Sequence, residues 1–293
     1  MTAPLDRLRA RLRETGAQLC LGIDPHPDQL PEGLTPSVAG IESFARGLIE
    51  AAAEHVVAVK INVAFFEAWG SAGWAALERV RADVPADLVC VLDAKRGDIG
   101  TTAERYAAGL FGVLAADAVT LSPYLGEDAI EPFLAYPDRM VYVLARTSNP
   151  SAPRLQGLEV AGVPLHLAVA RWVSDAWSDG RVGIVVGATA PTDMERLRAE
   201  IPGPAFLVPG VGAQAGDLAT AVRTCNGAWA PGLVSVSRGI AAASVGPDWR
   251  EAAAAAASGL RGRMRDVVLD SDASAVHVGA HRRFLIRADP RSC

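Results

Sequence analysis

Asp93, Lys95 and Asp98 form a dense group of side chains that could carry out chemistry. They lie in the segment Val91-Leu-Asp-Ala-Lys-Arg-Gly-Asp-Ile-Gly-Thr-Thr102, where an apolar run gives way to alternating acids and bases. If residues 88–93 form a strand, Asp93 and Lys95 share one face, because side chains on a strand alternate sides. A carboxylate and an ammonium group in one pocket could stabilise charge that develops on a substrate and then donate a proton to it.

An ordinary cluster of surface ion pairs is the alternative, since exposed pairs are common and weak. The context favours a functional site, because the run 89–92 before Asp93 is apolar and charges are rarely placed in partly desolvated positions for stability alone. Gly97 allows the backbone to turn after the charges. Thr101 and Glu104 have the spacing of a capping box that would begin a helix.

Elements that could position these charges alternate along the whole chain. Short β-like runs are followed by helical patterns of about a dozen residues or more, which is typical of parallel βα units. Eight such strands in 293 residues favour a closed (β/α)8 TIM barrel of the α/β class, although the count alone leaves an open doubly wound sheet as an alternative. The predicted strands are residues 18–24, 55–61, 88–93, 118–122, 140–145, 182–186, 205–208 and 233–236.

In such barrels the chemistry lies at the C-terminal ends of the strands. The first predicted strand ends at Asp24, the second carries Lys60, and the third delivers Asp93 and Lys95. The fifth leads into residues 146–150, Arg-Thr-Ser-Asn-Pro. We therefore expect these side chains to meet at one end of the barrel.

The loops after the last two predicted strands contain glycine. Residues 208–214 read Val-Pro-Gly-Val-Gly-Ala-Gln, and residues 235–239 read Ser-Val-Ser-Arg-Gly. Glycines let backbone N–H groups approach an anion closely, and Arg238 offers a fork of donors, so these loops predict a phosphate site. A tight βα turn is the alternative, because Gly-x-Gly alone is weak evidence.

Composition narrows the function classes. Half of the residues are hydrophobic, the net charge is -5 and the pI is near 5.6, which suits one large domain and makes nucleic acid an unexpected partner. The N-terminal residues 1–13 have leucines at helical spacing but lack the apolar core of a signal peptide, and no apolar stretch reaches the roughly 20 residues that span a bilayer. We therefore expect no membrane partner.

The four cysteines are scattered and indicate thiols in a reducing, cytoplasmic compartment. No metal-ligand spacing is present, so no metal site is expected. We predict a single catalytic domain over residues 1–265, with an N-terminal helix, and a C-terminal extension of unknown role over 266–293. Residues 151–164 are rich in Pro, Gly and Ser and predict a mobile lid.

The segment Asp93-Ala-Lys95-Arg-Gly-Asp98 resembles the signature of the orotidine 5'-phosphate decarboxylase family, most closely the branch with Asp-Ala-Lys-Arg-Gly-Asp. The resemblance extends over roughly residues 19–239 and agrees with the barrel. Its other matching segments, in order, are Cys20-Leu-Gly-Ile-Asp24-Pro, Val59-Lys60-Ile-Asn62, Thr147-Ser148-Asn149-Pro150, Pro209-Gly-Val-Gly-Ala-Gln214 and Ser237-Arg238-Gly239.

The resemblance implies cofactor-free decarboxylation of orotidine 5'-monophosphate to UMP and CO2, with Lys95 protonating the carbanion at C6. It implies that Lys60, Asp93, Lys95 and Asp98 are catalytic. The other roles implied by the resemblance are contact with the ribose by Asp24 and Lys60, with the pyrimidine by Ser148, and with the phosphate by Gln214 and Arg238, beside Ser237. Asp98, Ile99 and Thr102 resemble residues that this family lends to the neighbouring subunit, which implies a homodimer with shared sites.

Two other functions remain open on the sequence. A sugar-phosphate decarboxylase or aldolase of the same superfamily would stabilise an enediolate with Mg2+. It needs a further carboxylate ligand after the first or second strand, where the cation Lys60 would oppose a metal. A non-catalytic nucleotide-binding barrel would bind UMP without releasing CO2, and intact Asp93 and Lys95 argue against it.

Overall fold

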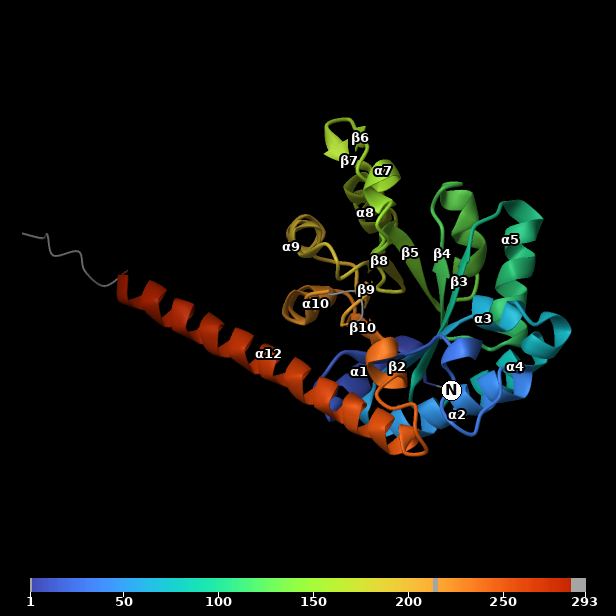
Figure 1. Ribbon diagram of the computed structural model, residues 1–293. Coiled ribbons are helices and arrows are strands. Elements are labelled where there is room, and N and C mark those ends of the chain that lie inside the picture. The colour runs from blue at the N-terminus through green and yellow to red at the C-terminus, as the bar shows by residue number, and fades with distance from the viewer. Residues whose placement is uncertain (1, 213–215, 286–293) are drawn as a thin grey trace, which may run out of the picture.

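The computed structural model describes residues 2–212 and 216–285, with side chains described as far as Asp270. Eight parallel strands pair in the order β1-β10-β9-β8-β5-β4-β3-β2 and close into a barrel, with helices on its outside (Figure 1). The prediction of a closed (β/α)8 barrel is therefore confirmed, and the open sheet is excluded. The barrel strands are β1 (Leu19–Ile23), β2 (Ala58–Asn62), β3 (Val89–Arg96), β4 (Ala118–Leu121), β5 (Met140–Arg146), β8 (Val182–Val186), β9 (Phe206–Pro209) and β10 (Leu233–Val236).

Helices connect successive strands, as the right-handed βα repeat requires. Between β5 and β8 the chain also forms a short antiparallel hairpin, β6 (Glu159–Val160) with β7 (Val163–Pro164), within the predicted lid. The α-helices are α1 (Pro4–Thr15), α2 (Val38–Ala52), α3 (Ala64–Glu67), α4 (Gly70–Ala82), α5 (Gly100–Ala107), α6 (Glu131–Leu134), α7 (Ala152–Gln156), α8 (Leu165–Ala176), α9 (Pro191–Glu200), α10 (Leu218–Cys225), α11 (Arg238–Ala241) and α12 (Trp249–Leu285).

The capping box predicted at Thr101 and Glu104 is wrong. Helix α5 begins at Gly100 after Ile99, and no side chain caps it. The segment Ala108–Val113 continues from α5 as a π-helix. The start of α5 is thus set by the loop that follows β3 rather than by a local cap.

On β2 and β4 the inward face of the strand changes from apolar to polar toward the C-terminal end. In β2 the inward Ala58 is followed two residues later by Lys60, and in β4 Ala118 is followed by Thr120. The apolar residues of this face pack together with Leu8 from α1. Since side chains alternate on a strand, the same register that buries the apolar layer directs the polar layer to the C-terminal end.

At the opposite end of the barrel, Asp117 ties α1 to the strands. Its side chain is fully buried, directly before β4. Arg7 of α1 forms an ion pair with its Oδ1, and Arg139 and Arg81 approach the carboxylate to 3.4 and 3.8 Å. The backbone N–H of Cys90 donates to Oδ2 at 2.9 Å. This carboxylate holds together four segments distant in sequence.

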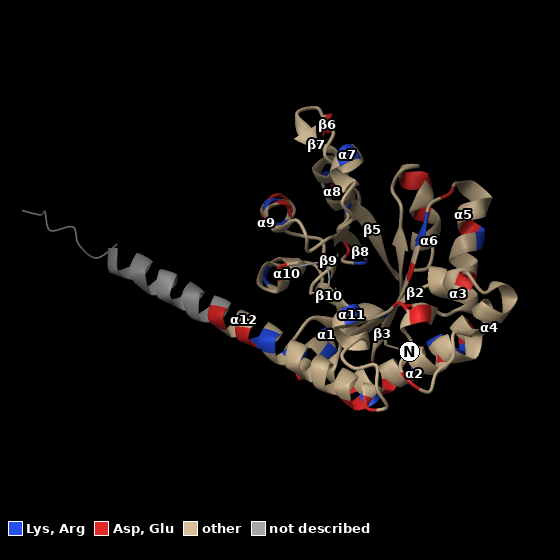
Figure 2. Ribbon diagram, in the orientation of Figure 1, with Lys and Arg blue, Asp and Glu red and all other residues tan. Residues whose placement is uncertain are grey.

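Helix α12 packs on the barrel over its first part and then runs beyond it (Figure 1). Trp249, Leu260 and Met264 are buried, whereas Leu269 is exposed. Lys and Arg positions and Asp and Glu positions are interspersed along the outer helices (Figure 2). None of the helices in the described part of the chain is long and apolar enough to cross a membrane.

We expect Asp117→Ala to lower the free energy of unfolding by about 3–5 kcal/mol, because removing one partner of a buried ion-pair cluster leaves uncompensated charge. Urea unfolding followed by circular dichroism measures the change. The control is Asp6→Ala, which removes an exposed ion pair to Arg9 and should change stability by less than about 0.5 kcal/mol. If Asp117→Ala lowers the free energy of unfolding by less than about 1 kcal/mol, this cluster stabilises the protein no more than an exposed ion pair does.

Candidate active site

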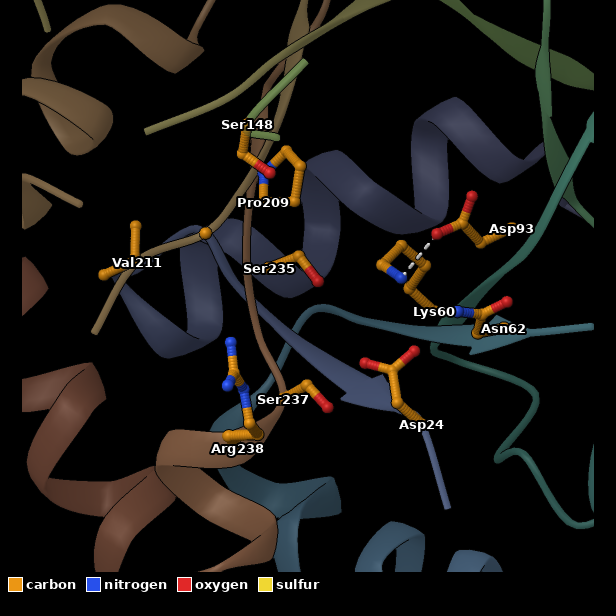
Figure 3. Close-up of a pocket in the computed structure, with 11 residues that line it drawn as sticks. Asp24, Lys60, Asn62, Asp93, Ser148, Pro209, Val211, Ser235, Ser237 and Arg238 are labelled. Atoms are coloured by element: carbon orange, nitrogen blue, oxygen red, sulfur yellow. Dashed lines mark hydrogen bonds and ion pairs between the residues drawn. The ribbon is translucent and has the colours of Figure 1, made fainter. Parts of the chain in front are cut away.

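Two adjoining hollows at the C-terminal end of the strands form one cavity, because they share Lys60, Asp93, Ser148 and Pro209. Figure 3 shows the first hollow, in which Asp24 and Lys60 lie toward one end and Arg238 at the other. The second hollow is lined by Lys95 and Thr120 together with residues that are mainly apolar. These further lining residues are Leu144, Thr147, Asn149, Val185 and Leu207.

Lys60, Asp93 and Lys95 form a continuous chain of ion pairs across this cavity. Lys60 Nζ donates to Asp93 Oδ2 at 2.8 Å (Figure 3), and Lys95 Nζ donates to Asp93 Oδ1 at 2.6 Å. The Lys60 and Asp93 side chains are only 7% and 11% exposed, whereas that of Lys95 is 50% exposed. Thus one ammonium group is fixed in the wall and the other faces the cavity, where it could reach a substrate.

The electrostatics keep the buried Asp93 and Lys60 side chains charged in the folded protein at neutral pH. Burial alone would raise the pKa of the Asp93 carboxyl, but the ammonium groups of Lys60 and Lys95 more than offset it and hold the pKa well below its ordinary value. Burial would likewise lower the pKa of Lys60, yet the carboxylates of Asp93 and Asp24 raise it above its ordinary value. The buried pair therefore persists as ions because each charge compensates the other.

Lys95 reaches Asp93 by a route that the sequence did not predict. Its φ angle is +46°, in the left-handed region, and the pairing of β3 with β4 shifts register between Leu92 and Arg96. Thr120 of β4 lies opposite this irregularity. Its Oγ1 lies 3.0 Å from the Lys95 backbone N and 2.9 Å from Asp93 Oδ1. Simple strand alternation is therefore not what brings Asp93 and Lys95 together.

At the other end of the cavity, the loops after β9 and β10 face Asp24. Gly210 and Gly212 have φ angles of +96° and +83°, which glycine adopts without strain. Ser237 and Arg238 follow β10 and line the cavity (Figure 3). This end offers a guanidinium and hydroxyl groups to an anion; the predicted Gln214 lies outside the described residues.

A close approach of two strands allows this arrangement. A Cβ atom at Gly22 of β1 would lie 2.8 Å from Ser237 Cβ, closer than real Cβ contacts. Only glycine therefore lets the loop after β10 lie this close to β1 and Asp24.

The predicted lid is attached to the wall of the cavity. Gln156, the last residue of α7, accepts from Thr147 N at 2.9 Å and donates to Thr147 Oγ1 at 2.7 Å. His166 Nδ1 lies 2.9 Å from the Gln156 carbonyl oxygen. Since Ser148 lines the cavity, these contacts connect the position of the lid to that of the predicted pyrimidine-binding residue.

Asp98 and Thr102 do not join the cavity of their own chain, whose described lining residues include neither. Asp98 Oδ1 accepts from the backbone N–H of Ile99 at 2.8 Å, and Thr102 is exposed on α5. The structure thus brings together seven of the ten predicted site residues. These are Asp24, Lys60, Asp93, Lys95, Ser148, Ser237 and Arg238.

Several lining residues were missed by sequence reasoning, among them Asn62, Thr120 and Ser235. Each is polar and lies two residues after another inward side chain of its strand. Because side chains two residues apart share one face of a strand, this spacing could have identified all three. The signal was weak because an isolated hydroxyl or amide near a strand end is common in proteins.

A family model described as "Orotidine 5'-phosphate decarboxylase / HUMPS family" matches residues 17–256. The orotidine 5'-phosphate decarboxylase of Roseiflexus castenholzii is 48% identical over 248 residues, which cover 84% of this chain and 91% of that protein. The UMP synthase of Leishmania donovani has a TM-score of 0.82 and 40% identity, with coverage of 91% of this chain and 56% of that one. The OMP decarboxylase of Leishmania donovani has a TM-score of 0.78 and 40% identity, with coverage of 90% and 99%.

We expect Lys60→Met to raise the pKa of Asp93 by about 1–3, because one compensating ammonium is lost while the burial remains. The ordinary value is 3.8. A carboxyl whose folded-state pKa is depressed adds stability above that value and loses it as the pH falls through the folded-state pKa. In Lys60→Met this contribution to stability should therefore be smaller, and its loss should be complete at a higher pH.

The measurement is carbon-13 NMR of protein labelled at the aspartate carboxyl groups, with Asp93→Asn to assign the resonance. Lys60→Arg, which keeps the positive charge, is the matched control and should leave the pKa low. An unchanged Asp93 pKa in Lys60→Met would mean that Lys60 does not stabilise the carboxylate.

Proposed function

The chain belongs to the orotidine 5'-phosphate decarboxylase family, and we propose that its Lys60–Asp93–Lys95 chain carries out the family's reaction. That reaction, decarboxylation of orotidine 5'-monophosphate to UMP and CO2, is the function of this protein, a carbon–carbon lyase of pyrimidine biosynthesis. The observation that carries the proposal is the contact of Asp93 with both lysine ammonium groups at 2.6 and 2.8 Å.

The chemical problem is a carbanion with little resonance stabilisation. Asp93, beside the substrate carboxylate, repels it in the ground state, and this repulsion is relieved as CO2 leaves. Lys95 faces the cavity, stabilises the negative charge that develops at C6 and then donates its proton to that carbon. Lys60 holds Asp93 ionised and in place.

Repulsion alone is too small to account for catalysis. Two like charges about 4 Å apart interact by roughly 4 kcal/mol at an effective dielectric of about 20. Enzymes lower barriers by as much as about 23 kcal/mol. Binding energy from remote parts of the substrate must therefore offset the unfavourable contact of two carboxylates.

The two ends of the cavity suit the remote parts of the substrate. We assign the ribose hydroxyls to Asp24 and Lys60 and the pyrimidine to Ser148. The phosphate is assigned to Arg238, Ser237 and Gln214. The support is the separation of Asp24 and Lys60 at one end of the cavity from Arg238 at the other (Figure 3). Attachment of α7 to Thr147 supports the role of residues 151–164 as a lid.

We further propose a homodimer in which Asp98, Ile99 and Thr102 complete the site of the partner subunit. Its support is the absence of Asp98 and Thr102 from the described lining of their own cavity. A hollow between α4 and α5 with a mainly apolar lining lies beside residues 98–102. Nearby, the side chains of Ile99 and Val113 are 52% and 71% exposed. Exposed apolar surface of this kind favours association with a second copy.

Residues 1–265 are proposed as the catalytic domain and residues 266–293 as an extension. The support is that packing of α12 on the barrel ends close to this boundary: Val268 still packs against the core, whereas Leu269 is exposed. A cytoplasmic location is proposed as well. Its support is that Cys20, Cys90 and Cys225 are free and buried, and that burial raises the pKa of each thiol to about 12. Such thiols are inert and suit a reducing compartment.

Lys95→Ala should reduce turnover by several orders of magnitude, because the proton donor is lost. Lys95→Arg is the matched variant: it keeps the charge but releases no proton, so it should also be inactive. Both should retain UMP binding and native circular dichroism. The assay follows loss of the orotate absorbance in the presence of excess EDTA. Turnover by the wild-type protein under these conditions would also argue against the Mg2+-dependent alternative. Near-normal turnover of Lys95→Ala would overturn the assignment.

The shared site predicts complementation between two inactive homodimers. In a mixed dimer of Lys95→Ala and Asp98→Ala, one site has both substitutions and the other has neither. With equal amounts and random exchange, half of the dimers are mixed and half of their sites are intact, so activity should recover to about a quarter of wild type. Mass spectrometry of the intact dimers verifies the exchange. No recovery after exchange would place Asp98 in its own chain's site or remove it from catalysis.

A further inference from the structure

Thr120 is a buried hydroxyl in a mainly apolar part of the cavity wall. It lies on β4, is only 1% exposed, and shares this hollow with Leu144, Val185 and Leu207. Its Oγ1 lies 2.9 Å from Asp93 Oδ1 and 3.0 Å from the backbone N of Lys95. One side chain therefore contacts both residues to which the chemistry is assigned.

The direction of both hydrogen bonds is fixed by the groups involved. An ionised carboxylate only accepts, so the single hydroxyl proton of Thr120 is directed to Asp93 Oδ1. A backbone N–H only donates, so Lys95 N–H is directed to a lone pair of the same oxygen. Hydrogen bonds to a charged group are stronger than those between neutral groups, which makes the bond to Asp93 the more important of the two.

The backbone explains why a side chain is needed at this position. The ladder between β3 and β4 pairs Leu92 with Val119 and then Arg96 with Leu121, leaving Asp93 to Lys95 outside the regular register. Lys95 has a φ of +46°, a conformation that costs a non-glycine residue free energy. Thr120 Oγ1 supplies the acceptor for the N–H that the interrupted ladder leaves unpaired.

We propose that Thr120 is a positioning residue for decarboxylation, which holds the Asp93 carboxylate and the Lys95 backbone in their reactive arrangement. This inference rests on the proposed roles of Asp93 and Lys95. Both Asp93 oxygens are then restrained, Oδ2 by Lys60 and Oδ1 by Thr120 together with Lys95. A carboxylate restrained at both oxygens cannot turn away from the substrate carboxylate, so the repulsion between them is retained until CO2 leaves.

The test compares Thr120→Val, which keeps the shape and removes the hydroxyl, with Thr120→Ser, which restores it. We expect kcat to fall about 10- to 100-fold in Thr120→Val, the effect of losing a hydrogen bond to a charged group. Thr120→Ser should remain within about 3-fold of wild type, because its hydroxyl can make both bonds. The Kd for UMP should change less than about 2-fold in both, since UMP has no carboxylate to meet Asp93.

A second readout separates positioning from general stability. Carbon-13 NMR should show a higher Asp93 pKa in Thr120→Val, because a hydrogen bond that favours the ionised form is lost. The control is Thr224→Val on α10, which removes another buried threonine hydroxyl, bonded to the Thr220 carbonyl oxygen at 2.7 Å. It should affect thermal stability and leave kcat unchanged.

The proposal is overturned if Thr120→Val keeps kcat within about 2-fold of wild type, or if kcat and UMP affinity fall in parallel as in a general distortion. It is also overturned if Thr120→Ser is as impaired as Thr120→Val. If Lys95→Ala is inactive while Thr120→Val is fully active, the positioning role of Thr120 is wrong but the proposed function stands. Full turnover by Lys95→Ala would remove the proposed function with it.

Discussion

The Asp93 carboxylate accepts hydrogen bonds from two ammonium groups and one hydroxyl although only 11% of its side chain is exposed. A charge in such a place is costly unless it is compensated, and here the compensation comes from β2, β4 and the end of β3 itself. These segments must therefore be held in fixed register. The rest of the barrel can be understood as the support that this register requires.

The packing that fixes this register begins at the N-terminal end of the strands. An inward apolar layer, capped by Leu8 of α1 and tied by Asp117, fixes the strands before the polar layer starts. On β2, β3 and β4 the polar side chains Lys60, Asp93 and Thr120 then lie two residues after the apolar Ala58, Val91 and Ala118 of this layer. On these strands the polar side chains of the cavity are thus separated from the core by one step of the strand period.

Much of this was accessible from the sequence, because the signals were local. Strand positions follow from apolar runs between helical patterns, and Asp93, Lys60 and Asp24 are placed by lying at strand ends. Other features are decided by contacts between segments. The left-handed backbone of Lys95 and its bond to Thr120 depend on how β3 meets β4, and the expected cap at Thr101 is replaced by a helix that begins one residue earlier. The apposition of Gly22 and Ser237 likewise needs a closed barrel.

The ion-pair chain has a consequence for covalent modification. Lys60 and Lys95 are the only lysines among the 293 residues, since every other residue in the count of 28 Lys and Arg is arginine. Of these two amines, Lys60 is sealed in the wall and Lys95 is half exposed. Acylating reagents that spare guanidinium groups therefore find a single accessible side-chain target, at the reactive end of the cavity. With Lys95 in its proposed role as proton donor, lysine acylation is expected to inactivate the protein, and a bound ligand that covers Lys95 is expected to protect against it.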